Sequence, residues 1–407
     1  MRRRSGLVAL AAVVGPGLLA GLSDDDPAGI TTYSILGADH GYALLWVLAL
    51  STLALVLFHE LGARLGIATG QGLAGLIRER YGVRWAGIGL LALVIANIGT
   101  TCAEFAGVAV ALDLVGVSRY VSVPVAAVLV SVLVLRGSFH RVEHVLLVLA
   151  TGFAAYIAAG LLAGPDWGAA AHGLVVPSLP LDRDALLIVT ATIGTTLAPW
   201  GLSFIQSYAV DKRLTADDMA YERIDVVTGA VMTGVIGVFV VVACAATLHV
   251  SGTSIDDAGD AAAALEPFAG ERATLLFGAG LLGAALLAAS ILPLATAYSV
   301  GEALGYEAGL DDSFREAPVF YVTYGAIVAI ASGIVLFPGA PLVPILVLTQ
   351  ALNAILLPPL LIFMARIARD PVIMGRHRSG RASAVAYAVT IAVIVVCVGA
   401  LAVLMVA

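Results

Sequence analysis

The sequence predicts an all-α integral membrane protein, and three observations support that fold class. Only 12% of the 407 residues are charged, whereas about 25% is usual in soluble proteins. Hydrophobic residues make up 60% of the chain, and the mean hydropathy is +1.02. Apolar runs of the roughly 20 residues that cross a bilayer recur throughout. These figures exclude a soluble enzyme, a nucleic-acid-binding protein and a disordered chain, so we expect the lipid bilayer as a partner and no nucleic acid.

Eleven apolar runs predict spanning helices, and no segment between them looks like a soluble domain. The fourth run is short, and the first is long and interrupted. A basic start followed by an apolar run also fits a signal peptide, but this run continues into three aspartates and ten more runs follow. We predict a single transmembrane domain with spans at 7–35, 43–66, 85–112, 121–135, 145–163, 185–210, 224–250, 273–302, 319–337, 341–366 and 383–406.

The basic residues predict the orientation of these spans. If the N-terminus is cytoplasmic and the sides alternate, all of the 21 Lys and Arg residues except Arg119, Arg183 and Arg272 fall in inner segments. Cytoplasmic loops carry such an excess of positive charge, and one span more or fewer would scramble it. We therefore expect a plasma (inner) membrane protein with a cytoplasmic N-terminus and an outer C-terminus.

The first span contains groups that lipid does not tolerate. Three aspartates, Asp24, Asp25 and Asp26, precede Pro27, and glycines lie on either side. Proline removes a helical hydrogen bond and disfavours helix at the residue before it, so an unwound stretch near mid-span is expected. Alternatively, the aspartates form an outer loop between two short segments, but that would shift the arginine count.

The sixth span is interrupted in a similar way, at residues 194–201, where Pro199 lies between glycines and beside threonines. A simple proline kink would also explain this pattern. The sixth span lies five helices after the first, and because five is odd, the second half would run inverted. Interrupted helices at matching places in inverted repeats mark a midplane substrate site. We predict repeats at 7–163 and 185–366, followed by an extra helix at 383–406.

Other polar groups lie within the predicted spans. A lone carboxylate at Glu104 is expensive in a membrane and is expected to face the site or water. Gln350 and Asn353 lie nearly on one helix face; a ligand and a hydrogen bond between helices are equally good readings of Gln350, and the hydrogen bond is favoured for Asn353. The dipeptide His59-Glu60 lacks a second histidine for a zinc motif, and we read it as a gate or salt-bridge pair with Arg64.

The residue types in the two interruptions indicate a hard cation. A carboxylate at Asp26 beside freed carbonyl groups supplies oxygen ligands. Neither interruption contains Met, His or Cys, which a softer metal would be expected to use. The small residues Gly29 and Ala198 leave room rather than contacts. Such a cavity suits an ion that keeps part of its water shell, as magnesium does.

At these residues the sequence resembles the Nramp divalent-metal transporters, and the resemblance covers most of the chain. It implies a LeuT-type fold, with two inverted five-helix repeats plus an eleventh helix. The matching segments are Gly15-Pro16-Gly17, the Asp26-Pro27 stretch, GYALLWVLAL at 41–50, LGIATG at 65–70, LIRERYG at 76–82, AEF at 103–105 and LVLTQ at 346–350.

The departures from the family pattern gather in helices 1 and 6. The family motif Asp-Pro-Gly-Asn reads Asp26-Pro27-Ala28-Gly29 here, so the metal-binding asparagine is replaced by Gly29. In helix 6, Thr195 stands at a family alanine position. Ala198-Pro199-Trp200 stands where the family has Met-Pro-His. The resemblance thus implies the loss of a thioether ligand and of a histidine linked to proton movement.

Helices 3 and 10 keep part of the pattern. The family pairs an Asp with a Glu three residues on, and here the pair reads Thr101 and Glu104. Gln350 matches a family glutamine that approaches the ion in some states. Because the scaffold is kept while the site departs, the chain looks like the Nramp-related magnesium transporters, a branch described as carrying magnesium, and also manganese, without proton coupling.

We therefore predict a monomeric transporter without a cofactor, which carries magnesium or manganese, largely hydrated, by alternating access. Two alternatives stay open: a proton-coupled manganese or iron transporter, and an amino-acid/cation symporter of the same fold. An intramembrane hydrolase is disfavoured because no paired acid and base is evident. The predicted metal site consists of Asp26, Gly29, Thr195, Ala198, Glu104 and Gln350.

Overall fold

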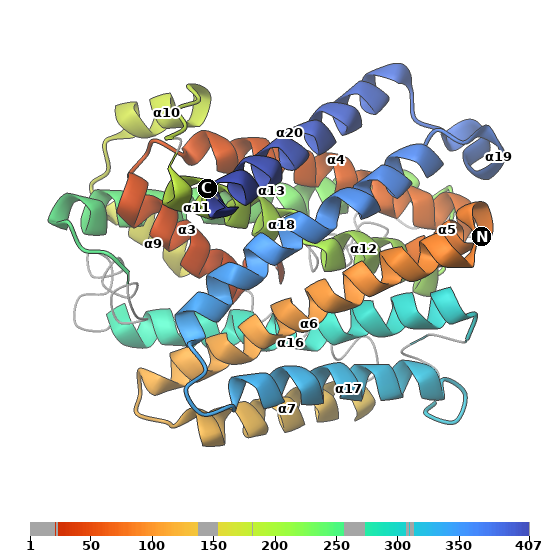
Figure 1. Ribbon diagram of the computed structural model, residues 1–407, viewed down its shortest axis with the longest axis horizontal. Helices are drawn as coiled ribbons and strands as arrows, with labels where there is room; N and C mark the ends of the chain where they lie inside the picture. Colours follow the sequence, from red (N-terminus) through yellow and green to blue (C-terminus); the bar gives the residue numbers. More distant parts are fainter. Residues whose placement is uncertain are drawn as a thin grey trace, which may run out of the picture.

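The computed structural model describes residues 21, 23–136, 154–180, 182–255, 273–306, 309 and 313–406, and in this part of the chain all regular structure is helical (Figure 1). Residues 7–20 and 145–153 of the predicted first and fifth spans lie outside it. The helices that correspond to the predicted spans are α3 (Pro27–His40), α4 (Leu45–Thr69), α6 (Val83–Asp113), α7 (Arg119–Arg136), α9 (Ala154–Leu162), α11 (Arg183–Thr196) with α12 (Pro199–Asp211), α13 (Met219–Cys244), α16 (Ala273–Leu304), α17 (Pro318–Val335), α18 (Leu342–Ile367) and α20 (Arg381–Val406).

Helices of spanning length confirm the predicted fold class. Within the described residues, eight are long and apolar enough to cross a membrane, and residues 119–134 of α7 form a shorter apolar helix. One of the eight combines α11 and α12, and another continues α13 through the π-helical turn Ala245–His249. Short helices α5 (Leu73–Tyr81), α10 (Trp167–Val175) and α19 (Pro371–Met374) connect the long ones.

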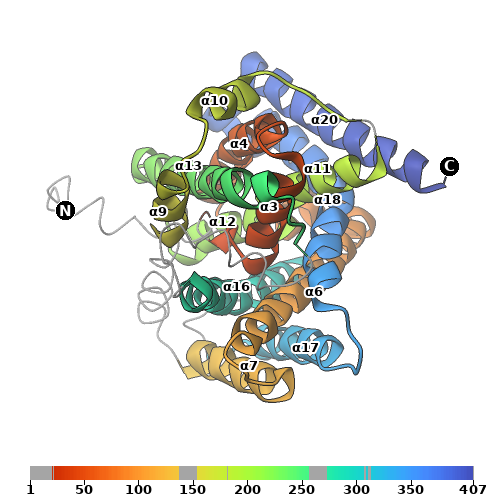
Figure 2. The same cartoon turned by 90° about the vertical axis from the view of Figure 1, so that its left-hand side faces the viewer.

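The interrupted helices lie at the centre of the molecule, and the last helix lies at its edge. In Figure 2, α3 and α12 are surrounded by α4, α13, α18, α6 and α16, while α20 runs along the outside. In an apolar stretch of 18 residues within the α11–α12 segment, 94% of the stretch is buried inside the protein. In the corresponding stretch of α20, only 17% is buried. A helix that exposes apolar side chains so extensively is suited to lipid contact.

Both predicted interruptions are present. Pro27 is the first residue of α3, and the side chain of Asp26 caps the helix. The second break separates α11 from α12 at Leu197 and Ala198, and Ala198 has extended backbone angles of φ −60° and ψ 133°. Proline fits the first turn of a helix because its missing N–H is not needed there. Each proline therefore starts a new helix instead of kinking a continuous one.

Backbones approach closely where the broken helix meets α18. A Cβ atom at Gly194 would collide with the carbonyl oxygen of Gln350 and approach the backbone nitrogen of Ala354 to 2.8 Å. Only glycine permits this contact, which places the end of α11 directly against α18. The predicted repeat boundaries, 7–163 and 185–366, stay a prediction.

Candidate metal site

The three consecutive aspartates of the first break interact with different parts of the molecule. Asp26 accepts a hydrogen bond from the backbone nitrogen of Gly29 at 2.5 Å. Oδ2 of Asp24 lies 3.9 Å from Nε2 of His59 on α4. Asp25 acts electrostatically on Tyr156, and also on Tyr33, on which Asp24 and Asp26 act as well. Each aspartate is at most 3% exposed, so none of them lies in an outer loop.

Asp26, Gly29 and Thr195 come together where α3 meets α11. A methyl group added at Gly29 would lie 2.9 Å from the carbonyl oxygen of Asp24, 3.0 Å from Oγ1 of Thr195 and 3.2 Å from Oδ1 of Asp26. The Thr195 hydroxyl is buried and has no hydrogen-bond partner among the described residues. A carbonyl, a hydroxyl and a carboxylate oxygen therefore surround the position that Gly29 leaves without a side chain.

Glu104 on α6 faces the same group. Its carboxyl group interacts directly with that of Asp26 and is fully buried. By geometric criteria neither of its oxygens has a hydrogen-bond partner in the described part of the chain. Two carboxyl groups in contact inside a membrane repel each other when both are ionised. A bound cation would remove this repulsion.

Ala198 and Gln350 lie near the second break, and among the described residues neither side chain forms a hydrogen bond with Asp26. Ala198 precedes α12, and its carbonyl oxygen accepts a bond from the Gly201 backbone nitrogen at 3.2 Å. The amide oxygen of Gln350 accepts a bond from Asn353 at 2.9 Å, and its amide nitrogen has no partner among the described residues. Asn353 also donates to Thr100 on α6 at 2.9 Å, which is the hydrogen bond between helices that we expected.

The residue that sequence reasoning missed at the centre is His59. Its side chain is fully buried and lies beside Asp24, and both contact the position of Gly201 in the first turn of α12. The histidine was visible in the sequence, but we grouped it with Glu60 and Arg64. Adjacent residues on a helix point in different directions, and only the packing of α4 against α3 and α12 shows which of them faces the site.

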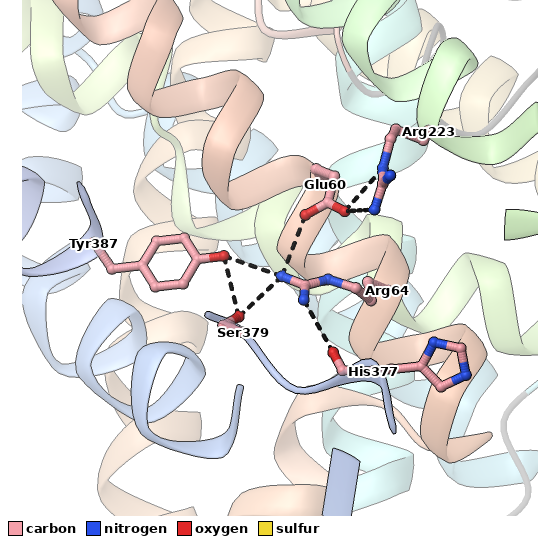
Figure 3. A network of polar contacts seen from close by, with 6 residues as sticks. All are labelled: Glu60, Arg64, Arg223, His377, Ser379 and Tyr387. Carbon is pink, nitrogen blue, oxygen red and sulfur yellow. Dashed lines mark hydrogen bonds and ion pairs between the residues drawn. The ribbon is translucent and has the colours of Figure 1, made fainter. Parts of the chain in front are cut away.

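Glu60 and Arg64 form the predicted ion pair, at 3.3 Å, and it belongs to a larger network (Figure 3). Glu60 also accepts two hydrogen bonds from Arg223 of α13. Arg64 donates to the His377 carbonyl oxygen, to Ser379 and to the Tyr387 hydroxyl of α20, at 3.0 Å each. The network ties α4 to α13 and to the final helix.

No Lys or Arg of the described residues lies beside the central carboxyl groups. Among the described residues, none of Asp24, Asp25, Asp26 and Glu104 pairs with Lys or Arg. The described residues also contain no cluster of three or more His, Cys, Asp and Glu side chains that could hold a metal. A cation here would therefore be bound by few charged ligands, supplemented by neutral oxygens.

Comparison with known proteins identifies the family of this chain. The model of the family described as "Natural resistance-associated macrophage protein-like", or Nramp, matches residues 17–404. The chain belongs to the Nramp family. This Nramp chain is 33% identical over 290 residues to the divalent metal cation transporter MntH of Burkholderia ambifaria. The match covers 69% of this chain and 66% of the relative, so the chain spans just under two thirds of the relative's length. It is 27% identical to MntH of Granulibacter bethesdensis over 374 residues, which are 89% of this chain and 81% of the relative.

Solved structures show that the fold of this Nramp chain is the LeuT type. The manganese transporter of Eremococcus coleocola, in complex with an aromatic bis-isothiourea substituted compound, superposes with a TM-score of 0.76 at 20% identity, over 98% of this chain and 87% of that one. MhsT in complex with L-phenylalanine gives a TM-score of 0.62 at 12% identity, over 99% and 98%. The chain is thus a multi-pass integral membrane protein of the Nramp family.

Proposed function

We propose that this protein transports divalent metal cations, chiefly magnesium and also manganese, by alternating access and without proton coupling. The observation that carries the proposal is the set of groups around Gly29, which are oxygens of Asp24, Asp26 and Thr195. Hard cations prefer oxygen ligands, and magnesium keeps several waters when bound. Gly29 and Ala198 stand where the family sequence has asparagine and methionine, and the space they leave suits a hydrated ion.

The site residues take different roles in this proposal. Asp26 is the anionic anchor, and Thr195 contributes its hydroxyl group directly. Glu104 acts through water or through Asp26. Gln350 acts from α18 through water, and its amide nitrogen has no partner among the described residues. The ion supplies the positive charge that no described Lys or Arg places beside these carboxylates.

Membrane voltage is a sufficient driving force for such uptake. A divalent cation gains about 4.6 kcal/mol per 100 mV on entering a negatively charged interior, which corresponds to an equilibrium accumulation of roughly a thousandfold. The sequence lacks the helix 6 histidine and the helix 3 aspartate of the family pattern. We therefore infer that the protein takes up its ion down the electrochemical gradient. We also infer that it is a monomer in the plasma membrane, with a cytoplasmic N-terminus and an outer C-terminus.

Ion flux in proteoliposomes tests the proposal. The full chain is reconstituted with a magnesium indicator and, separately, a pH dye inside the vesicles, and a potassium gradient with valinomycin sets the voltage. We expect magnesium influx that grows with inside-negative voltage, moves no protons and is lost in Asp26→Ala. Uptake by Asp26→Ala equal to that of the wild type would overturn the site.

Proton-coupled manganese transport is the second candidate function. The solved manganese transporter favours manganese as the cargo, and Glu104 beside Asp26 is a carboxyl group that could carry a proton. In the same vesicles, acidification of the interior during manganese influx, lost in Glu104→Gln, would select this candidate over the first. An amino-acid cargo is disfavoured because three aspartates make the neighbourhood anionic.

A further inference from the structure

A second group of unpartnered polar atoms lies beside the Asp26 site. Both carboxylate oxygens of Asp24 and both ring nitrogens of His59 are buried and lack hydrogen-bond partners among the described residues. The indole nitrogen of Trp200, in the first turn of α12, is likewise buried without a partner. Buried polar groups are nearly always satisfied, so these atoms indicate a missing ligand or water.

The distance between the two side chains fits an atom held between them. Nε2 of His59 and Oδ2 of Asp24 are 3.9 Å apart, which is too long for a hydrogen bond. A metal ion that binds one imidazole nitrogen and one carboxylate oxygen at about 2.1 Å each separates these atoms by roughly 3.0 to 4.2 Å, depending on the angle at the metal. Gly201 keeps the adjoining space open, since a Cβ there would lie 3.3 Å from Nε2 and 3.4 Å from Oδ1 of Asp24.

The surrounding helices hold both groups in place. The carboxylate of Asp24 lies beside the first turn of α12, close to the position of Gly201. His59 lies on the segment of α4 that the neighbouring Glu60 and Arg64 fix to α13 and α20 (Figure 3). Its imidazole is therefore held towards Asp24 by contacts on a different side of α4.

We propose that Asp24 and His59 form a second cation station beside the Asp26 site, and that this station takes borderline transition-metal dications such as Co²⁺ and Zn²⁺ in preference to Mg²⁺. Imidazole suits these metals, whereas Mg²⁺ prefers oxygen and water. With two protein ligands and the remaining positions filled by water, the station binds ions in transit. It gives this chain a nitrogen ligand that neither interrupted stretch contains.

The station has a consequence for ion flux. A transition metal bound by Asp24 and His59 lies close enough to Asp26 for their charges to interact, and it hinders the passage of the next ion. Zn²⁺ and Co²⁺ are therefore expected to inhibit uptake through His59. The station requires a cation path at Asp26 but not that magnesium be the cargo, so the two proposals can fail separately.

Titration of purified full-length protein with Co²⁺ tests the station. In an Asp26→Asn background we expect a remaining Co²⁺ site, seen by visible absorption and by a paramagnetically shifted imidazole proton. Adding His59→Gln should weaken this site at least tenfold and abolish the shifted resonance, and Asp24→Asn should do the same. In the protein with Asp26 intact, His59→Gln should weaken Co²⁺ binding at least fivefold more than it weakens Mg²⁺ binding. The matched control is His249→Gln, because that imidazole is already bonded to the Ala38 carbonyl oxygen at 2.8 Å.

The same titration can overturn the station. Absence of a shifted imidazole resonance in the wild type, or its persistence in His59→Gln with unchanged Co²⁺ affinity, refutes it and leaves a purely structural pair. Unchanged thermal unfolding of Asp24→Asn confirms that a loss of Co²⁺ binding is not a loss of fold. If the Co²⁺ site is present but no magnesium flux occurs, the station stands and the proposed cargo is wrong.

Discussion

The carboxyl groups of Asp26 and Glu60 lie in opposite electrostatic surroundings. Glu60 accepts hydrogen bonds from Arg223 and pairs with Arg64. Asp26 contacts a backbone N–H and the carboxyl group of Glu104, and among the described residues it meets no Lys or Arg. A buried carboxylate without a counter-charge is costly. The chain thus neutralises the charge of Glu60 itself and leaves the charge of Asp26 to an ion from outside.

Replacing each carboxylate by its amide is the strongest way to test this comparison. Asp26→Asn should lose the stabilisation by magnesium, which is about 1.4 kcal/mol at ten times Kd, without loss of stability in the ion-free protein. Glu60→Gln should keep the magnesium effect and lose up to about 1 kcal/mol of stability, because two arginines lose their partner. Thermal unfolding in detergent with and without magnesium measures both. Equal magnesium shifts in the two variants would contradict the comparison.

The second-largest effect is expected from a methyl group at Gly29, which should block the central site. Its Cβ would lie within 3.2 Å of three oxygens of the site, so the space for a hydrated ion disappears. Gly29→Ala is expected to reduce magnesium uptake at least tenfold while the protein still folds. Gly325→Ala on α17, where a Cβ meets nothing within 4 Å, is the control and should leave uptake unchanged. Full uptake by Gly29→Ala would mean that the ion does not use this gap.

The hydroxyl of Thr195 should matter more than that of Thr190 on the same helix. The Thr190 hydroxyl donates to the Leu186 carbonyl oxygen at 2.7 Å, whereas that of Thr195 has no partner among the described residues. Thr195→Val removes a ligand worth about 1 kcal/mol, so the magnesium Kd should rise roughly fivefold. Thr190→Val should leave Kd unchanged. Calorimetric titration measures both, and equal Kd values for the two variants would argue against Thr195 as a ligand.

The smallest expected effect is at the exposed pair of Arg80 and Asp370, where Arg80 Nε donates to Oδ2 of Asp370 at 2.6 Å. This hydrogen bond lowers the pKa of Asp370 below its ordinary value, so the pair stabilises the protein above about pH 4 and loses its effect as pH falls through the lowered pKa. The difference in thermal midpoint between wild type and Asp370→Asn should be constant from pH 6 to 8 and vanish in acid. A difference that changes between pH 6 and 8 would contradict this reading.

Much of the fold was readable from hydropathy and proline placement. Each predicted span within the described residues has a helical counterpart, and both breaks occur next to Pro27 and Pro199. Lipid leaves unpaired backbone groups no other partner, so apolar length and helix breakers are reliable signals. The short connecting helices α5 and α10 escaped prediction because neither is long enough to give a spanning signal.

The site was predictable only in part. Sequence identified Asp26, Gly29, Thr195 and Glu104 as candidates, because charge and glycine in a membrane span are rare enough to point to a function. It could not tell which aspartate contacts which helix. That depends on the backbone of the unwound stretch, where successive side chains follow neither the helical nor the extended period.

The amino-acid sequence alone determined that this protein spans a membrane by helices, that two of them are broken, and that the breaks contain oxygen-bearing side chains without sulfur or imidazole. Only the tertiary structure decided that His59 joins Asp24 while its neighbour Glu60 turns to Arg64 and Arg223. The physical reason is that composition and periodicity act within one helix, whereas the neighbours of a buried charge are set by the packing of α4 against α3, α12 and α13.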